Sequence, residues 1–326
     1  MSTRRYADDT PPHYYFVKLG SANRLAAPLL RDACLGMPHV LCAFQNASQA
    51  RIEEHLAGKR SRENQQAVAM YRWSRSTGGY AVTVALGNLW VLLPLEPSYE
   101  IDQLPDCIER DALGGPFCHA VSVAVGAAMP TNSVPAVLAG LMVHRSYIST
   151  QFKLIEQDPG ILLALDHVLF RAGLVSEYPT EQRADKTLSG LLSCLTHQQL
   201  VALVARIAED HGLRAGASTG GFVRDIDLVL YNDSADPIDA AGLTVPARTK
   251  FRSGAVSLGV SHVPDQEQLA EGVDYRLEGQ CLRDRGTERA DWLASALVAA
   301  PHAWDWLERT LRWVPFARQV LMQTRR

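Results

Sequence analysis

The alternation of apolar and polar residues predicts three β-strands between residues 225 and 262. Each strand is rich in Val, Leu or Ile and is separated from the next by turn residues; the strands are Asp225–Leu230, Gly242–Phe251 and Ala255–His262. Because successive side chains of a strand point to opposite faces, Asp225 and Asp227 share one face of the first strand. Arg248 and Lys250 share one face of the second strand in the same way. If these two strands pair, two carboxylates face a guanidinium and an ammonium across the sheet.

An amphipathic helix is predicted before these strands, over residues 195–215. Leu200, Leu203 and Ile207 recur at helical spacing, and Thr196 is a typical N-cap residue. A Gly-rich turn joins this helix to the first strand. Helix and strands in this order predict an α/β domain in the C-terminal half of the chain.

The helix, the Gly-rich turn, the strand DIDLVL and a strand that ends in Lys resemble the Mrr-like branch of the PD-(D/E)XK restriction endonucleases. The resemblance spans residues 190–300 and implies a restriction-endonuclease-like αβββαβ domain. It implies that Asp227 binds a catalytic Mg²⁺ and that Lys250 is the catalytic lysine. Asp225, two residues along the same strand, is the one residue that could stand in as a second carboxylate for the metal. The chain departs from the family pattern at Arg248, where the family usually carries Glu or Gln. The acidic residue of the family's first helix is also missing. In an active enzyme, Arg248 would bind the phosphate instead of serving as an acid.

The N-terminal half predicts a smaller α+β module. Its elements are a strand at 13–20, helices at 48–60 and 62–75, and a hairpin at Tyr80–Leu95. The pair Gly87-Asn88 is the expected turn of the hairpin. The segments YFVKLGS and LWVLLP resemble the EVE/PUA-like modules that often precede endonuclease domains in defence proteins. This resemblance implies a reader of modified bases.

Aromatic and basic residues of this module are candidates for nucleic-acid contacts. An aromatic-walled base pocket would use Tyr71, Trp73, Tyr80 and Trp90. Phosphate contacts would use Lys59, Arg60, Arg62, Arg72 and Arg75. Two structural interpretations stay open beside these. The aromatic residues fill the core of a small barrel, and the basic residues form a solvated connection between helices.

Composition bounds these expectations. The chain has 326 residues, of which 47% are hydrophobic and 21% charged, which suits about two globular domains. Its formal net charge of −3 means that any contact with nucleic acid must come from local patches. Six scattered cysteines are typical of buried thiols in a reducing cytosol, and the N-terminus carries no apolar signal segment. The longest apolar stretch, His119–Met142, is broken by Pro130 and Pro135, so we expect a cytoplasmic protein with no membrane span.

These patterns predict four regions along the chain. They are a disordered leader at 1–12, an EVE/PUA-like recognition module at 13–150, a helical linker at 151–189 and an Mrr-like domain at 190–326. The polar stretch Ser176–Thr187 is the strongest boundary signal. Residues 96–150 give no functional prediction.

Three functions are compatible with the sequence. The first is a metal-dependent restriction endonuclease of the defence type, which cleaves modified DNA selected by the N-terminal module. A homodimer is expected for it, because cleavage of both strands by this fold generally needs two sites. The second is a catalytically degenerate DNA-binding protein, or a subunit of a defence assembly. In it, the acids and bases of the two strands form structural ion pairs. Pro246 favours this function, because a proline cannot donate a hydrogen bond to a neighbouring strand. The third is an RNA-directed role, since PUA-like modules also resemble RNA readers.

Overall fold

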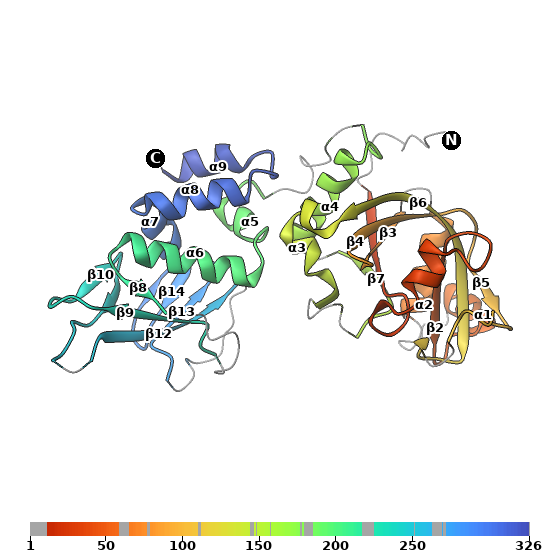
Figure 1. The fold of residues 1–326 in the computed structure, drawn as a ribbon, viewed down its shortest axis with the longest axis horizontal. Helices are drawn as coiled ribbons and strands as arrows, with labels where there is room; N and C mark the ends of the chain where they lie inside the picture. Colours follow the sequence, from red (N-terminus) through yellow and green to blue (C-terminus); the bar gives the residue numbers. More distant parts are fainter. Residues whose placement is uncertain are drawn as a thin grey trace. The chain divides into compact units, whose positions relative to one another are not determined.

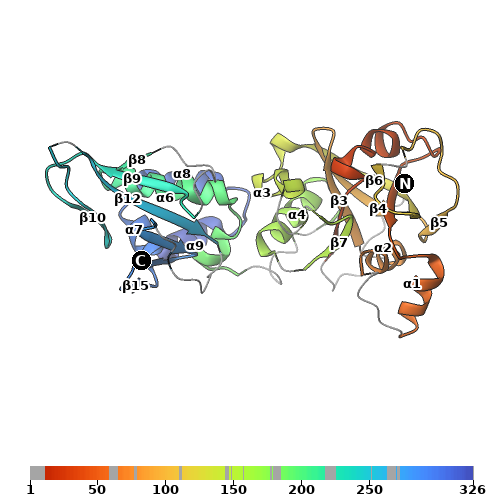
Figure 2. The same ribbon diagram turned by 90° about the horizontal axis from the view of Figure 1, so that it is seen from below.

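The computed structural model divides into two compact units, residues 1–183 and 184–326 (Figures 1 and 2). It describes residues 12–58, 65–76, 79–109, 112–143, 147, 149–156, 158–176, 178, 185–216, 225–250, 252–262, 269 and 272–325. The predicted leader therefore lies outside the described residues, except for Pro12. Both units combine helices with a β-sheet, which confirms the α/β class. None of the described helices is long and apolar enough to cross a lipid bilayer.

The first unit is built around a seven-stranded sheet with the order β2-β6-β4-β3-β1-β7, in which β5 also pairs with β6. Its strands are β1 (His13–Val17), β2 (His39–Phe44), β3 (Gly79–Ala85), β4 (Asn88–Pro94), β5 (Tyr99–Ile101), β6 (Phe117–Pro130) and β7 (Phe152–Ile155). Strand β6 pairs with β2 and β5 along its first half and with β4 along its second half, so it joins two parts of the sheet. The α-helices described in this unit are α1 (Gln49–Leu56), α2 (Gln65–Arg75), α3 (Ala136–Ala139) and α4 (Pro159–Arg171).

The hairpin predicted in the first unit is confirmed as β3 and β4. Its turn is Leu86-Gly87, one residue earlier than expected, because Ala85 pairs with Asn88. Leu86 and Gly87 both have positive φ, 53° and 74°, as the favoured two-residue hairpin turn requires.

The segment 151–189, which the sequence predicts to be a helical linker, is largely part of the first unit. Strand β7 pairs with β1, and Phe152 is fully buried. Helix α4 is fixed to the same sheet, because the Tyr14 hydroxyl donates a 2.5 Å hydrogen bond to the buried carboxylate of Asp166. The boundary between units falls at 183/184, and helix α5 (Leu188–Leu192) opens the second unit. A helix was predicted in this segment, but not the burial that ties it to the sheet.

The second unit contains a six-stranded sheet with the order β15-β14-β13-β12-β9-β8. Its strands are β8 (Arg214–Ala215), β9 (Leu228–Asn232), β12 (Gly254–Ser261), β13 (Tyr275–Glu278), β14 (Cys281–Arg283) and β15 (Glu288–Arg289). Strands β12 and β13 run parallel, and the other neighbours run antiparallel. The helices described here besides α5 are α6 (His197–Asp210), α7 (Trp292–Val298), α8 (Pro301–Thr310) and α9 (Ala317–Thr324).

Helix α6 confirms the helix predicted before the strands. The Thr196 side chain accepts a hydrogen bond from the Gln199 backbone N–H, and the Gln199 side chain accepts one from the Thr196 N–H. This reciprocal capping box satisfies two backbone donors and sets where the helix begins. Leu200, Leu203 and Ile207 are fully buried, and α6 lies between the sheet and α8 (Figure 1).

Two of the three predicted strands have different bounds and partners. The strand predicted at Asp225–Leu230 begins only at Leu228, because the chain turns at Asp225, where φ is +64°. Of the strand predicted at Gly242–Phe251, only β11 (Leu243–Val245) forms, and it ends at Pro246, which has no N–H for a ladder. It pairs with β10 (Ile238–Ala240) in a separate sheet, while β12 pairs with β9. The predicted pairing of the first two strands is therefore wrong, and the third strand is confirmed as β12.

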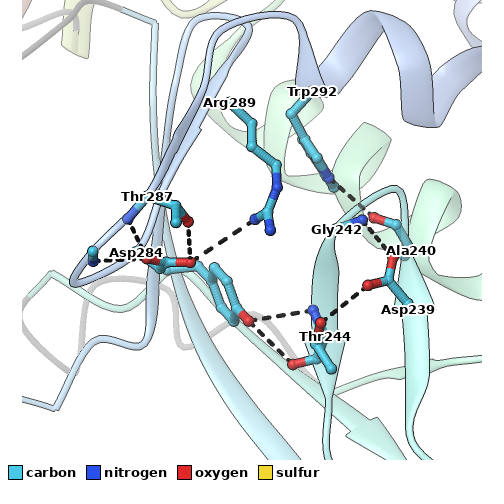
Figure 3. A network of polar contacts seen from close by, with 10 residues as sticks. Asp239, Ala240, Gly242, Thr244, Asp284, Thr287, Arg289 and Trp292 are labelled. Atoms are coloured by element: carbon cyan, nitrogen blue, oxygen red, sulfur yellow. Dashed lines mark hydrogen bonds and ion pairs between the residues drawn. The ribbon is translucent and has the colours of Figure 1, made fainter.

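Contacts with β13, β15 and the start of α7 fix the position of the β10–β11 hairpin (Figure 3). The Tyr275 hydroxyl bonds both the N–H and the carbonyl of Thr244, 3.2 Å from each. The Trp292 indole N–H donates to the Ala240 carbonyl at 3.0 Å. The Arg289 side chain lies so close to Gly242 that a Cβ there would sit 2.4 Å from its Nε. These long-range contacts hold the hairpin in place, and no short sequence window contains them.

Candidate functional site

The candidate site is a cavity in the second unit, where α6 begins, β9 begins and β12 ends. Its volume is about 330 Å³. The lining residues are His197, Asp225, Asp227, Gly259, Val260, Ser261, Val273 and Arg276. Four of the eight carry ionisable side chains, and α6, β12 and β13 contribute to one opening.

Asp227 makes contacts through both of its carboxylate oxygens. One carboxylate oxygen, Oδ1, lies 3.0 Å from His197 Nε2, and Oδ2 accepts a 2.8 Å hydrogen bond from the Val260 N–H. Its own backbone N–H donates to the Leu258 carbonyl. His197 is the first residue of α6, so the capping box that starts the helix also positions its imidazole. The result is a His–Asp pair that links α6 to two strands.

The pair shifts the pKa values of both groups. Burial pushes the pKa of Asp227 up, but hydrogen bonds from His197 and the Val260 N–H, with the charges of His197 and Arg276, outweigh burial and leave the pKa below its ordinary value. The hydrogen bond to Asp227 raises the pKa of His197 above its ordinary value, although burial opposes it. We therefore expect an imidazolium–carboxylate pair in mildly acidic solution.

Arg276 reaches the cavity from β13 because Gly259 lies between it and Asp227. Gly259 is in register with Arg276 and carries no side chain, and a Cβ there would lie 2.7 Å from the Asp225 carbonyl oxygen. Arg276 forms an ion pair with Glu278 at 3.4 Å, and Arg283 pairs with the same carboxylate at 3.2 Å. The Glu278 side chain is only 1% exposed. The buried carboxylate of Glu278 thus holds Arg276 in position at the wall of the cavity.

The structure brings together two of the four predicted catalytic residues. Asp225 and Asp227 line the same cavity. Lys250 and Arg248 precede β12, whose first residue Gly254 pairs with the last residue of β9. They therefore lie at the far end of the β9–β12 ladder from Asp227, across about 13 Å of strand. The predicted surface of two acids facing two bases is not formed, because its two strands do not pair.

The residues at the cavity do not fit a Mg²⁺ centre. Mg²⁺ requires near-octahedral oxygen coordination. Both oxygens of Asp227 already accept hydrogen bonds, one of them from a histidine whose protonated form repels a cation. Among the residues that the structure describes, no group of three or more His, Cys, Asp or Glu side chains is placed to hold a metal ion.

The aromatic candidates of the first unit are mostly core residues. Trp73 is fully buried, and its indole N–H donates to the Gly79 carbonyl at 3.2 Å. Tyr80 is 1% exposed. Trp90 is partly buried, and its N–H donates to the Ala85 carbonyl at 2.9 Å. These residues pack the sheet, as the core interpretation predicts, and do not form the wall of an open pocket.

The basic candidates of the first unit divide into two groups. Arg72 and Arg75 are exposed on α2, and the Arg75 guanidinium lies 3.4 Å from the centre of the Tyr71 ring. Lys59, Arg60 and Arg62 lie outside the described residues. The exposed pair remains available for phosphate contacts.

His197 and Arg276 were missed as candidates, although the sequence carries a signal for each. His197 directly follows the N-cap residue Thr196. Because side chains of a helix are tilted toward its N-terminus, a residue in the first turn can reach groups that lie beyond that end. Arg276 and Glu278 are two residues apart on one strand and therefore share a face. What no local pattern shows is that β13 lies beside β12.

Comparisons with known proteins do not indicate a role for the cavity residues. The chain matched no protein-family model, no curated protein and no solved structure. The role of the cavity must therefore follow from its own side chains.

Proposed function

We propose that the chain is a nucleic-acid-binding protein whose second unit uses a nuclease-like sheet for binding and not for cutting. One observation carries the proposal. Asp227, the acid expected to hold the metal, is committed to His197 and the Val260 N–H, while the expected catalytic Lys250 lies at the far end of the ladder. The two side chains that the predicted catalysis needs together are thus separated.

The order of elements supports a nuclease-like scaffold. Helix α6 is followed by β8, β9 and β12 as antiparallel neighbours and then by β13 parallel to β12. Asp227 stands directly before β9, as the resemblance to the Mrr-like endonucleases implies. Fold alone does not give activity, so the side chains decide between binding and cleavage.

Local positive charge supports binding in a chain whose net charge is −3. Arg72 and Arg75 are exposed on one helix of the first unit, and Arg276 and His197 reach the cavity of the second. Guanidinium groups are the usual donors to phosphate oxygens and base edges. Each unit therefore offers cationic donors to a nucleic acid.

Binding and cleavage are separated by one pair of assays. Fluorescence anisotropy with unmodified and modified duplex DNA, with and without chelator, measures binding, and gels with Mg²⁺ or Mn²⁺ measure cleavage. We expect binding that chelator leaves unchanged and no cleavage. The proposal fails if metal-dependent cleavage appears, is lost in Asp227→Asn and persists in Asp236→Asn, a matched change at an exposed acid outside the cavity.

A metal-dependent endonuclease is the second candidate, favoured by one observation. Asp225 and Asp227 line the same cavity, so two carboxylates do converge. The same gels decide this case. Parallel titrations of duplex DNA and structured RNA at matched salt decide which nucleic acid is preferred, because affinities at different salt cannot be compared.

A further inference from the structure

The C-terminal segment of the second unit is rich in positive charge. Between residues 309 and 325 the chain has four arginines and no Asp, Glu or Lys; the arginines are Arg309, Arg312, Arg318 and Arg325. All four are exposed. In a chain with a net charge of −3, such a run provides a local attraction for an anionic partner. Because exposed arginines also occur on surfaces that bind nothing, their arrangement in space has to show whether they act together.

Two contacts place the arginines of α9 along one side of α8. The Arg318 Nε lies 3.9 Å from Glu308 Oε1, and the central carbon of the Arg325 guanidinium lies 5.4 Å from the centre of the Trp304 ring. Arg318 and Arg325 are seven residues apart and therefore share a face of α9. Because they meet α8 in the reverse order of the chain, the two helices run antiparallel. Figure 1 shows α8 and α9 on the side of α6 that faces away from the sheet.

A third arginine lies in the turn that joins these two helices. Arg312 is exposed there, and its apolar neighbours in the turn are buried, namely Leu311, Val314 and Phe316. The turn is therefore held by apolar packing, and it presents Arg312 to solvent shortly before α9 begins. The position of this guanidinium is fixed before any ligand binds, which lowers the entropy that binding costs.

We propose that Arg312, Arg318 and Arg325 form a surface that binds the sugar–phosphate backbone of a nucleic acid. The inference rests on the proposed function, since the phosphates belong to that ligand. A guanidinium donates charge-assisted hydrogen bonds to phosphate oxygens whatever the base sequence. Arg318 and Arg325 are separated by about 10 Å of helix, a length that about three phosphates of one DNA strand cover along the duplex axis. Arg309 is not part of this surface, because its Nε donates to the Asp305 carbonyl of its own helix at 3.2 Å.

The burial of α9 favours a nucleic acid over another common anionic surface, a lipid membrane. Helices that lie on membranes insert an apolar face between the lipid headgroups. The apolar face of α9 is instead buried within the unit through Ala317, Val320 and Leu321. Among the described residues of α9, Met322 is the one exposed large apolar side chain. A soluble polyanion needs no such insertion, so it fits this surface better.

Glu308 gives the proposal a test of opposite sign. Its carboxylate faces Arg318, and the side chains are 45% and 82% exposed, so their ion pair is weak. A phosphate that binds Arg318 has to replace this carboxylate or lie beside it. Removing the carboxylate should therefore strengthen binding, whereas removing an arginine should weaken it.

Fluorescence anisotropy of the full chain over a series of salt concentrations tests the surface. The probes are two nucleic acids of unrelated sequence, from whichever class binds more tightly, duplex DNA or structured RNA. Each of Arg312→Gln, Arg318→Gln and Arg325→Gln should weaken binding of both probes about fivefold and lower the slope of log affinity against log salt by about 1. The triple variant should lower the slope by about 3. Glu308→Gln should instead tighten binding about twofold.

Arg285→Gln is the matched control. Arg285 is exposed on the turn between β14 and β15, so this variant loses the same charge outside the proposed surface and should leave the slope unchanged. All the substituted arginines are exposed and Gln is a good helix former, so each variant should keep its melting temperature. Vesicles that contain phosphatidylserine are the probe for a lipid partner.

Three outcomes overturn the surface and leave the proposed function standing. The first is an unchanged slope in the triple variant while nucleic acid still binds. The second is weaker binding by Glu308→Gln. The third is vesicle binding that the triple variant loses while its affinity for nucleic acid equals that of the wild type. If the wild-type chain binds neither duplex DNA nor structured RNA, the surface and the proposed function both fail.

Discussion

The two units treat their candidate residues in opposite ways. In the first unit, Trp73 is surrounded by core side chains and its polar N–H is satisfied by a backbone carbonyl. In the second unit, Asp227 and Arg276 border a cavity, where Asp227 pairs with His197 and Arg276 pairs with Glu278. Residue type made Trp73 and Asp227 candidates for binding, whereas Arg276 was recognised only from the structure. Burial and the satisfaction of polar atoms separate a packing role from a site.

The largest effect expected from this contrast is at Trp73. Trp73→Ala should reduce the free energy of unfolding of the first unit by about 4 kcal/mol, because it leaves a large cavity in the core. Urea denaturation followed by tryptophan fluorescence and circular dichroism measures it. Nucleic-acid affinity should stay unchanged where the variant is folded. A stable variant with weakened binding would instead place Trp73 in a binding site.

A smaller loss is expected at Glu278 in the second unit. Glu278→Gln should cost about 3 kcal/mol, because Arg276 and Arg283 lose the buried carboxylate that neutralises them. Glu288→Gln is the matched control, since Glu288 also pairs with Arg283 but is exposed, and it should change the urea midpoint little. Equal effects of the two substitutions would contradict the role of Glu278 as a buried support.

The His197–Asp227 pair should make stability depend on pH. The pKa of His197 is raised by folding, so its contribution is complete below the unfolded pKa and lost as pH rises through the folded pKa. The pKa of Asp227 is lowered, so its contribution is complete above the unfolded pKa and lost as pH falls through the folded pKa. The pair therefore contributes most between the two unfolded pKa values, about pH 4 to 6.5.

His197→Gln measures this contribution. Because the His197 side chain is half exposed, solvent screening limits the loss to about 0.5 kcal/mol. The difference in melting temperature between wild type and variant should be largest near pH 5 and shrink above the folded pKa of His197. A difference that is constant across pH would show that the ion pair does not form in solution.

The smallest effect on stability is expected at Arg75. Arg75→Ala removes a guanidinium that stacks on the exposed side of Tyr71, which is worth about 0.5 kcal/mol. If Arg75 contacts phosphate, the slope of log affinity against log salt should fall by about 1 without a change in sequence preference. An unchanged slope would show that Arg75 does not contact phosphate.

Sequence patterns predicted some elements well because their signals are local. Thr196 and Gln199 set the start of α6 within four residues, and the alternation in β12 predicted that strand closely. The predicted pairing of strands was wrong, because alternation shows which residues share a face of a strand but not which strands are neighbours. The stretch before Lys250 resembled a strand, but Pro246 ends β11 after Val245. Tyr275, far along the chain, holds the β10–β11 hairpin away from a pairing with β9.

The sequence by itself determined the α/β class, the capped helix α6 and the hairpin of the first unit. Only the tertiary structure decided that Asp227 faces His197 and Arg276, and that Lys250 lies at the other end of the ladder. The physical reason is the range of the interactions. Caps, turns and alternation act over a few residues, whereas a site is assembled by strands and helices that meet only when the core is packed.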